Sequence, residues 1–214
     1  MTSPRRTAVT AVVFDLGGVL IDWDPRHLYR RLLASEEEIE TFLDEVDFAG
    51  WNHAMDAGRG TWAEAVQELG ARHPHRRELI AAYPARFAET LSGALDDSVE
   101  VLRDLAEQGT RLFALTNWSA ETFETARHRF GFLDLFDDIV VSGEEGVAKP
   151  DPAIFAVLVD RHRLDPAGTV FVDDAPANVD AATAAGLTGL LFTDAQGLRR
   201  DLSRLGLLAG AGSG

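Results

Sequence analysis

The chain has 214 residues, a length that suits either one large hydrophobic core or a core domain with a small insertion. Its 20 basic and 35 acidic side chains leave a formal charge of −15, and because such a surface repels polyanions, we expect neither nucleic acid nor membrane as a partner. The absence of cysteine excludes disulfides, thiolate zinc sites and a cysteine nucleophile. It also fits a reducing compartment, so we predict a cytoplasmic protein.

The first predicted element is a short strand. Val12, Val13 and Phe14 form an apolar, β-prone run that ends abruptly at Asp15, and glycines at positions 17 and 18 then let the chain turn sharply. A carboxylate is thereby placed just beyond the carboxyl end of a strand, where parallel α/β sheets bind ligands. An aspartate before a glycine turn is also a common turn-former, so Asp15 alone does not indicate a reaction.

A block of helices follows this strand. Capping boxes formed by Ser35 with Glu38 and by Thr61 with Glu64 mark the starts of two of them. The apolar spacing predicts helices over about residues 25–33, 35–46, 61–70 and 77–91. No segment between residues 23 and 93 has the pattern of a strand.

From residue 97 onward, helices alternate with short apolar strands. Helices are expected at 98–109, with Ser98 as the N-cap, and at about 120–129, 152–162 and 176–186. Strands are expected at 110–116, 137–142, 168–174 and 188–193. This alternation predicts an α/β, Rossmann-like fold with a mostly parallel sheet and helices on both faces. Residues 1–22 and 97–214 would form this core, and residues 23–96 a small all-helical cap.

Polar side chains lie at the ends of several predicted strands. Asp15 follows the first strand, and Lys149 precedes the helix that begins near residue 152. Because the carboxyl ends of parallel strands meet at one edge of a sheet, we expect these side chains to converge there. Each also has a simpler interpretation, as a turn residue, a helix cap or an exposed lysine. The other members of the set are Thr116, Asn117, Asp173 and Asp174.

Carboxylates from different strands form a site suited to a hard divalent cation. Mg²⁺ prefers oxygen ligands, and in proteins it takes part of its coordination from water and phosphate. Without a cation, Asp15, Asp173 and Asp174 would repel one another. A lysine and two polar side chains beside them would complete an anion site, so the pattern predicts phosphoryl chemistry with an aspartate as the nucleophile.

The sequence resembles the haloacid dehalogenase-like hydrolase superfamily, in its phosphatase-like branch. The resemblance rests on FDLGGVL at 14–20, LTNWS at 115–119, AKPDP at 148–152 and FVDDAPAN at 171–178. The four motifs follow in the family's order along the sheet-forming part of the chain. The helical block after the first motif resembles the family's cap.

The resemblance implies a metal site built around the nucleophile. Asp15 matches the nucleophile and Asp174 the acidic Mg²⁺ ligand, while the backbone carbonyl of Gly17 would supply another contact. Asp173 would bind Mg²⁺ through water or hold the site in place. Asn178 would support it from the following helix.

The resemblance also implies a phosphate site. Thr116 and Asn117 would bind the transferring phosphoryl group. Lys149 would offset negative charge on the nucleophile and on the phosphate.

The chain departs from the family at one position. Phosphatases of the family usually carry a second aspartate, the general acid and base, two residues after the nucleophile, where this chain has Gly17. A general acid contributes roughly 10² to 10⁴ in rate, so a replacement is expected. Asp22 and Asp24 are the nearby candidates, and we favour Asp24 because it lies at the hinge into the cap. The alternative is that Asp24 only caps the helix that begins at Pro25.

Three residues of the helical block are candidates for contacting the substrate. Arg59 lies between two glycines just before a capped helix, and Trp23 and Trp51 flank the first half of the block. The alternative interpretation is that the tryptophans pack in the interior and Arg59 lies on the surface.

The leading functional hypothesis is a Mg²⁺-dependent phosphatase. It would hydrolyse a small phosphorylated metabolite through an aspartyl-phosphate on Asp15. A sugar phosphate is favoured, because a phosphate on an anomeric carbon has a good leaving group and needs a general acid least. The alternatives are a metal-free 2-haloacid dehalogenase, in which Asp15 would displace halide, and a non-catalytic phosphoryl-binding protein. Either a monomer or a homodimer is compatible with the sequence.

Overall fold

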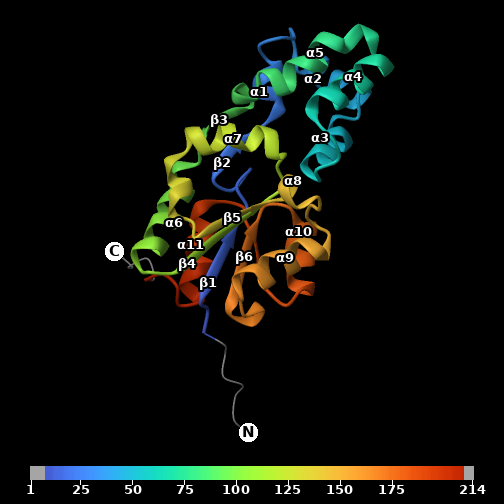
Figure 1. Ribbon diagram of the computed structural model, residues 1–214. Helices are drawn as coiled ribbons and strands as arrows, with labels where there is room; N and C mark the ends of the chain where they lie inside the picture. Colours follow the sequence, from blue (N-terminus) through green and yellow to red (C-terminus); the bar gives the residue numbers. More distant parts are fainter. Residues whose placement is uncertain (1–7, 210–214) are drawn as a thin grey trace.

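A five-stranded parallel sheet forms the centre of the molecule, and a group of helices lies beyond one end of it (Figure 1). The computed structural model describes residues 8–209, so residues 1–7 and 210–214 of the predicted core lie outside it. The strand order is β5-β4-β1-β6-β7. The strands are β1 (Ala11–Phe14), β4 (Arg111–Thr116), β5 (Asp138–Val141), β6 (Thr169–Asp173) and β7 (Thr188–Leu191).

The central strand β1 is buried on both faces. Val13 lies between Phe113 of β4 and Phe171 of β6, and all four residues of β1 are fully buried. This is why the strand reads as a continuous apolar run rather than as an alternating one. Its side chains alternate between the two hydrophobic clusters that lie on opposite sides of the sheet.

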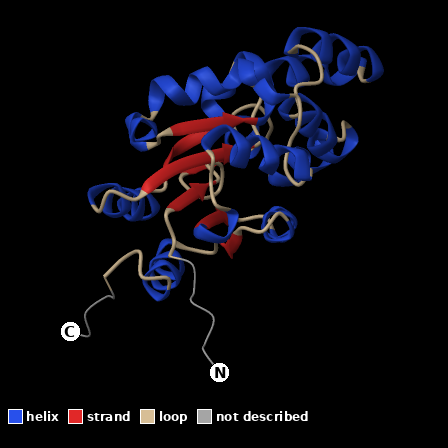
Figure 2. Cartoon of the chain, turned by 60° about the horizontal axis from the view of Figure 1, so that its bottom comes forward, coloured by secondary structure: helices blue, strands red, loops and turns tan. Residues whose placement is uncertain are grey.

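Helices cover both faces of the sheet, as predicted (Figure 2). One face packs against α6 (Asp96–Glu107), α7 (Ala120–Arg129) and α11 (Ala195–Arg204). The other packs against α9 (Pro152–His162) and α10 (Pro176–Ala184). The short α8 (Ser142–Glu145) follows β5 directly. No helix formed by residues 8–209 combines the length and the apolarity needed to cross a membrane.

The segment between β1 and α6 contains five further helices. They are α1 (Pro25–Tyr29), α2 (Glu36–Glu45), α3 (Phe48–Asp56), α4 (Trp62–Arg72) and α5 (Arg77–Ala85), with 3₁₀ turns η1 (Pro74–Arg76) and η2 (Phe87–Thr90). Thr61 and Glu64 form the expected capping box. Ser35 caps α2, but the Glu38 carboxylate accepts the N–H of Ala34 rather than that of Ser35.

A two-stranded antiparallel ribbon joins these helices to the core, and neither of its strands was predicted from the sequence. β2 (Ile21–Trp23) pairs with β3 (Leu91–Ala94), a segment in which no strand was predicted. β3 has only four residues, with a small glycine-containing centre, so its sequence pattern is too weak to predict a strand. It forms a strand by pairing with β2, where Ile21 lies opposite Ala94. The predicted N-cap Ser98 is also wrong, since α6 begins at Asp96 and Ser98 lies buried in its first turn.

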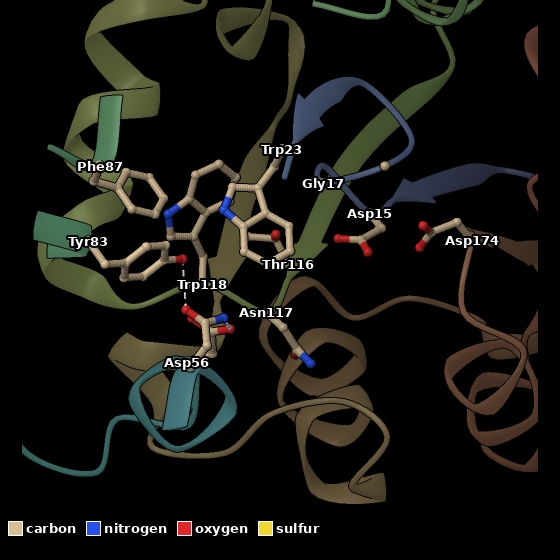
Figure 3. A pocket seen from close by; sticks show the side chains of 12 residues that line it. Asp15, Gly17, Trp23, Asp56, Tyr83, Phe87, Thr116, Asn117, Trp118 and Asp174 are labelled. Atoms are coloured by element: carbon tan, nitrogen blue, oxygen red, sulfur yellow. Dashed lines mark hydrogen bonds between the residues drawn. The ribbon is translucent and has the colours of Figure 1, made fainter. Parts of the chain in front are cut away.

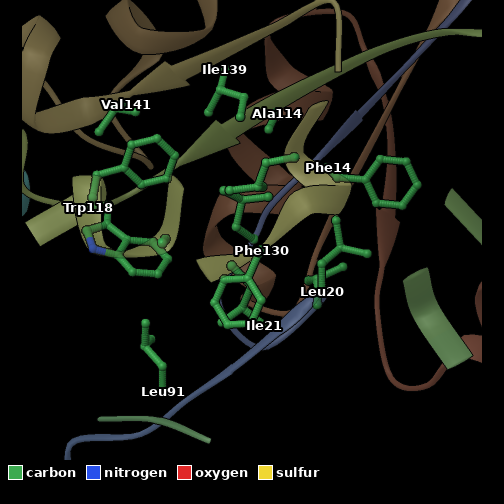
Figure 4. Packing of buried hydrophobic residues seen from close by; sticks show 14 of the residues in the cluster. Phe14, Leu20, Ile21, Leu91, Ala114, Trp118, Phe130, Ile139 and Val141 are labelled. Carbon is green, nitrogen blue, oxygen red and sulfur yellow. The ribbon is translucent and has the colours of Figure 1, made fainter. Parts of the chain in front are cut away.

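One hydrophobic cluster runs from beneath the sheet through the ribbon into the helical segment. Phe14 and Ala114 belong to the sheet, Ile21 and Leu91 to the ribbon, and Trp118 lies at the junction with the helices (Figure 4). Phe87 of η2 packs edge-on against Trp118 with ring centroids 5.7 Å apart. The cap segment is thus held over the sheet by apolar packing.

Candidate active site

The carboxyl ends of β1, β4 and β6 meet at one edge of the sheet, beneath the helical segment. The side chains that follow them line a cavity of about 310 Å³. Figure 3 shows the carboxylates of Asp15 and Asp174 at one end of this pocket and aromatic rings at the other. The predicted residues that line it are Asp15, Gly17, Trp23, Thr116, Asn117 and Asp174.

Asp15 has one oxygen engaged by the protein and one directed to the pocket. Oδ1 accepts the N–H of Leu16 at 2.7 Å and pairs with Nζ of Lys149 at 3.0 Å, whereas Oδ2 has no hydrogen-bond partner within residues 8–209. Burial raises the pKa of Asp15 to about 7, with the Lys149 charge opposing this shift and the Asp173 charge adding to it. The free oxygen is the one available for nucleophilic attack.

Lys149 lies behind Asp15, fully buried, and does not line the pocket. Its ammonium group donates to the carbonyl of Leu115 at 2.8 Å and to Oδ2 of Asp173 at 2.7 Å, in addition to pairing with Asp15. Burial by itself would lower the pKa of Lys149, but the two carboxylates outweigh it and the pKa is raised. The lysine is therefore a buried cation that contacts Asp15.

Asn117 positions this lysine. Its side-chain oxygen accepts the N–H of Lys149 at 2.8 Å, and its amide nitrogen donates to the Lys149 carbonyl at 2.9 Å. The neighbouring Thr116 is buried, and its hydroxyl faces the pocket without a hydrogen bond to any described residue. Thr116 thus has free hydrogen-bonding capacity in the pocket, whereas the Asn117 amide uses one donor and its oxygen to hold the Lys149 backbone.

Asp173 is held by the protein on both of its oxygens. Oδ1 accepts the N–H of Ala175 at 2.8 Å and the amide of Asn178 at 3.0 Å, and Oδ2 accepts from Lys149 and from Asn178 at 3.1 Å. Of the two roles considered for Asp173, holding the site in place fits this saturated environment better. Asn178, in the first turn of α10, donates to both Asp173 oxygens.

The acidic groups form a donor set suited to a hard cation. One oxygen from each of Asp15, Asp173 and Asp174 lies within 4.8 Å of the others. Burial, and then the Asp173 charge, raises the pKa of Asp174. Gly18 has a positive φ of 73°, and a Cβ there would collide with the Asp174 carboxylate, so the turn after β1 packs directly on it. Crowded carboxylate oxygens, two of them from Asp15 and Asp174 with raised pKa values, fit a divalent ion such as Mg²⁺.

Comparison with known proteins agrees with this geometry. The sequence model of one protein family, the haloacid dehalogenase-like hydrolases, matches residues 9–186. The chain belongs to the haloacid dehalogenase-like hydrolase family. It is a hydrolase, as the motifs predicted.

Two curated relatives of this hydrolase are named as phosphatases. A sesquiterpene phosphatase from Aspergillus oryzae is 29% identical over 201 residues, which cover 93% of this chain and 97% of the relative. A phosphoglycolate phosphatase from Cereibacter sphaeroides is 30% identical over 186 residues, 86% of this chain and 84% of the relative. These relatives support hydrolysis of phosphoric monoesters as the class of reaction.

A solved structure shares the fold. A family enzyme from Bacteroides thetaiotaomicron, in complex with magnesium and inorganic phosphate, has a TM-score of 0.65 and 21% sequence identity, covering 87% of this chain and 96% of that one. At this identity the likeness concerns the fold alone, and the Rossmann-like prediction is confirmed.

The structure does not bring Asp24 into the pocket of this hydrolase. Its Oδ1 accepts the N–H of Arg26 at 2.8 Å as the N-cap of α1, and it pairs with the Arg26 guanidinium at 3.3 Å. Asp22 is engaged in the ribbon by Ser92 and His27. The helix-capping interpretation of Asp24 therefore fits, because the helix that follows uses its carboxylate locally.

Of the cap residues proposed to meet the substrate, only Trp23 lines the pocket. Arg59 is exposed and lines a separate depression with Thr61 and Glu64. The glycines on either side of it have left-handed backbone conformations, with φ of 70° and 90°, which glycine adopts without strain. Trp51 packs against Trp62, with ring centroids 4.9 Å apart, and belongs to the interior of the cap.

Several pocket residues went unnoticed in the sequence. Asp56 at the end of α3 is the main one, and Tyr83, Phe87 and Trp118 supply aromatic walls (Figure 3). Trp118 had a usable signal, since it directly follows the Thr116–Asn117 pair. Asp56 had only its place before a glycine-rich loop, which is ordinary for a helix end.

Proposed function

We propose that this hydrolase is a Mg²⁺-dependent phosphatase acting on a small phosphorylated metabolite through an aspartyl-phosphate on Asp15. One observation carries the proposal: Oδ2 of Asp15 is free and faces a pocket, while Oδ1 is held by a buried lysine. A carboxylate so oriented is suited to attack phosphorus.

Three residues of the chain would act on the phosphoryl group, each in a different way. Thr116 would donate its free hydroxyl to a phosphoryl oxygen, and Asn117 would complete this side of the pocket. Lys149 offsets the charge of Asp15 and of the incoming phosphate by electrostatics from behind the nucleophile. Water would then release phosphate from Asp15 in a second step.

Asp15, Asp174 and the carbonyl of Gly17 would hold Mg²⁺, with Asp173 supporting them. The cation would neutralise phosphate charge and favour the ionised form of Asp15, whose pKa is raised by burial.

The walls of the pocket favour a substrate with an uncharged leaving group. Trp23, Tyr83, Phe87 and Trp118 line it, and none of its lining residues is basic. A neighbouring cavity shares Trp23 and contains Arg26, but Glu40 holds that guanidinium at 2.6 and 2.8 Å. A second phosphate or a carboxylate would therefore lack a partner. Sugar monophosphates, whose rings stack on aromatic side chains, fit best.

Phosphate release from a panel of compounds, with Mg²⁺ and with EDTA, tests the proposal. We expect turnover of glucose 1-phosphate and similar monophosphates, loss of turnover in EDTA, and weaker turnover of phosphoglycolate and ribulose bisphosphate. Turnover that persists in EDTA or in Asp15→Asn would refute the mechanism. Halide release from 2-chloropropionate in EDTA would favour the dehalogenase alternative. Stable binding of beryllofluoride without turnover of any compound would favour the non-catalytic one.

A further inference from the structure

The position that usually holds the general acid is open in this chain. A Cβ placed on Gly17 would meet no atom within 4 Å. The backbone there does not have a positive φ that would demand glycine. A side chain could therefore start at position 17 without a clash at its Cβ, yet the carboxylate is absent there, while a poor leaving group such as an alkoxide still needs a proton.

Asp56 is the one acidic residue that the helical segment contributes to the pocket (Figure 3). It lies across the pocket from the strand ends, the side toward which a leaving group departs in an in-line attack by Asp15. Among residues 8–209, no basic side chain forms an ion pair with it. Its carboxyl group is thus available to the pocket.

A chain of hydrogen bonds fixes the orientation of Asp56. The amide of Asn52 donates to Oδ2 of Asp56 at 2.8 Å, and the Tyr83 hydroxyl donates to the Asn52 oxygen at 2.9 Å. Burial holds the pKa of Tyr83 well above its ordinary value, so this hydroxyl stays a donor. The backbone carbonyl of Asp56 accepts from Ser142 of the core, which ties the end of α3 to the sheet.

The surroundings of Asp56 suit a group that both gives and takes a proton. Burial raises the pKa of Asp56 to about 7, and the charge of Asp15 adds to this shift. The backbone N–H of Ser119 and the charge of Lys149 oppose it. Near neutral pH both protonation states are populated, which is the condition for efficient general acid and base catalysis.

We propose that Asp56 is the general acid and base of this hydrolase, taking the role of the carboxylate that is absent at position 17. This inference rests on the proposed phosphatase function. In the first step Oδ2 of Asp15 bonds to phosphorus, the bond from phosphorus to the leaving oxygen breaks, and Asp56 gives that oxygen its proton, directly or through one water. In the second step Asp56 takes a proton from water as the water oxygen bonds to phosphorus and the bond to Asp15 breaks.

Pre-steady-state kinetics with two substrates test this role. p-Nitrophenyl phosphate has a leaving group that needs no acid, whereas an alkyl phosphate needs one. In Asp56→Asn we expect turnover of the alkyl phosphate to fall about 10²- to 10⁴-fold. The burst of p-nitrophenol should persist, followed by slow release of phosphate, because only the second step then needs the base.

Two further variants complete the test. Gly17→Asp in the Asp56→Asn background should restore at least about tenfold of the lost turnover, since it returns a carboxylate to the open space at position 17. Asp24→Asn is the matched control and should leave turnover unchanged, because asparagine also caps helices well. Loss of the p-nitrophenol burst in Asp56→Asn, or loss of turnover in Asp24→Asn alone, would overturn the assignment. Absence of phosphate release by the unmodified enzyme would instead refute the phosphatase function.

Discussion

The two halves of the pocket are built in opposite ways. On the sheet side, Lys149, Asp173 and Asn178 saturate one another with hydrogen bonds and hold Asp15 from behind. On the cap side, aromatic rings surround a single carboxylate, Asp56, that pairs with no cation of the described residues. Under the proposed function, the difference separates two tasks. The rigid charged centre would fix the nucleophile, and the mostly apolar wall would shield the leaving group and keep one acid near its neutral form.

The largest effect is expected from removing the proposed nucleophile, Asp15. Asp15→Asn keeps the shape of the sheet-side centre but takes away the attacking oxygen, so phosphate release should fall by about 10⁴-fold or more. Binding of the phosphate mimic vanadate, followed by fluorescence of the pocket tryptophans, shows whether the site is still formed. Activity within tenfold of the unmodified enzyme would contradict the assignment.

The next largest effect is expected at the buried lysine. Lys149→Met leaves Asp15 and Asp173 as buried charges without their partner, so the free energy of unfolding at pH 8 should drop by about 3 to 5 kcal/mol. The loss should shrink at pH 5, because protonation of Asp15, whose pKa burial raises to about 7, removes part of the uncompensated charge. Urea unfolding at both pH values measures this change in stability. A loss below about 1 kcal/mol at pH 8 would show that the stability of this charged centre depends less on the Lys149 charge than we infer.

Replacing Asp56 should have the opposite effect on stability to replacing Lys149. A carboxyl whose pKa is raised from 3.8 to about 7 by folding makes the protein less stable as pH rises between those values, since the folded state retains the proton that the unfolded state has lost. Asp56→Asn removes that penalty, so in EDTA at pH 8 the variant should be about 2 to 4 kcal/mol more stable than the unmodified chain.

The gain should shrink as the pH falls and largely disappear near pH 3, where Asp56 is mostly protonated in both the folded and the unfolded state. Thermal unfolding across this pH range measures it, with Asp24→Asn as the reference. A variant that is equally stable at pH 4 and pH 8 relative to the unmodified chain would mean that Asp56 titrates normally.

The smallest effect concerns the contact between the two halves. The indole N–H of Trp62 donates to the Ser119 hydroxyl at 2.8 Å in a buried position. Trp62→Phe keeps an aromatic ring but removes this donor, so stability should fall by about 1 to 2 kcal/mol. Turnover should change little, because Trp62 does not line the pocket. A large drop in turnover with normal stability would show that cap position, not cap attachment, controls the reaction.

The sheet side of the pocket was predictable from the sequence because its pattern is local. Asp15, Thr116 and Asp173 each end a short apolar run, and parallel strands necessarily bring such ends together. Even there, the pattern did not reveal that the Asn117 amide is committed to the backbone of Lys149. Such pairings depend on which loops become neighbours after folding.

The cap side of the pocket could not be predicted from the sequence, because it depends on tertiary structure. Asp24 is close to Asp15 in sequence, yet its carboxylate caps α1, whereas Asp56 reaches the pocket from the end of α3. β3 exists only because its partner β2 lies beside it. By itself the sequence determined the family, the parallel core and the charged centre, since strand ends and glycine turns are encoded by residues that follow one another directly in the chain. Only the packing of the cap over the sheet decided which acid and which aromatic rings line the pocket, and that Arg59 lies outside it, because apolar packing has no fixed spacing along the chain.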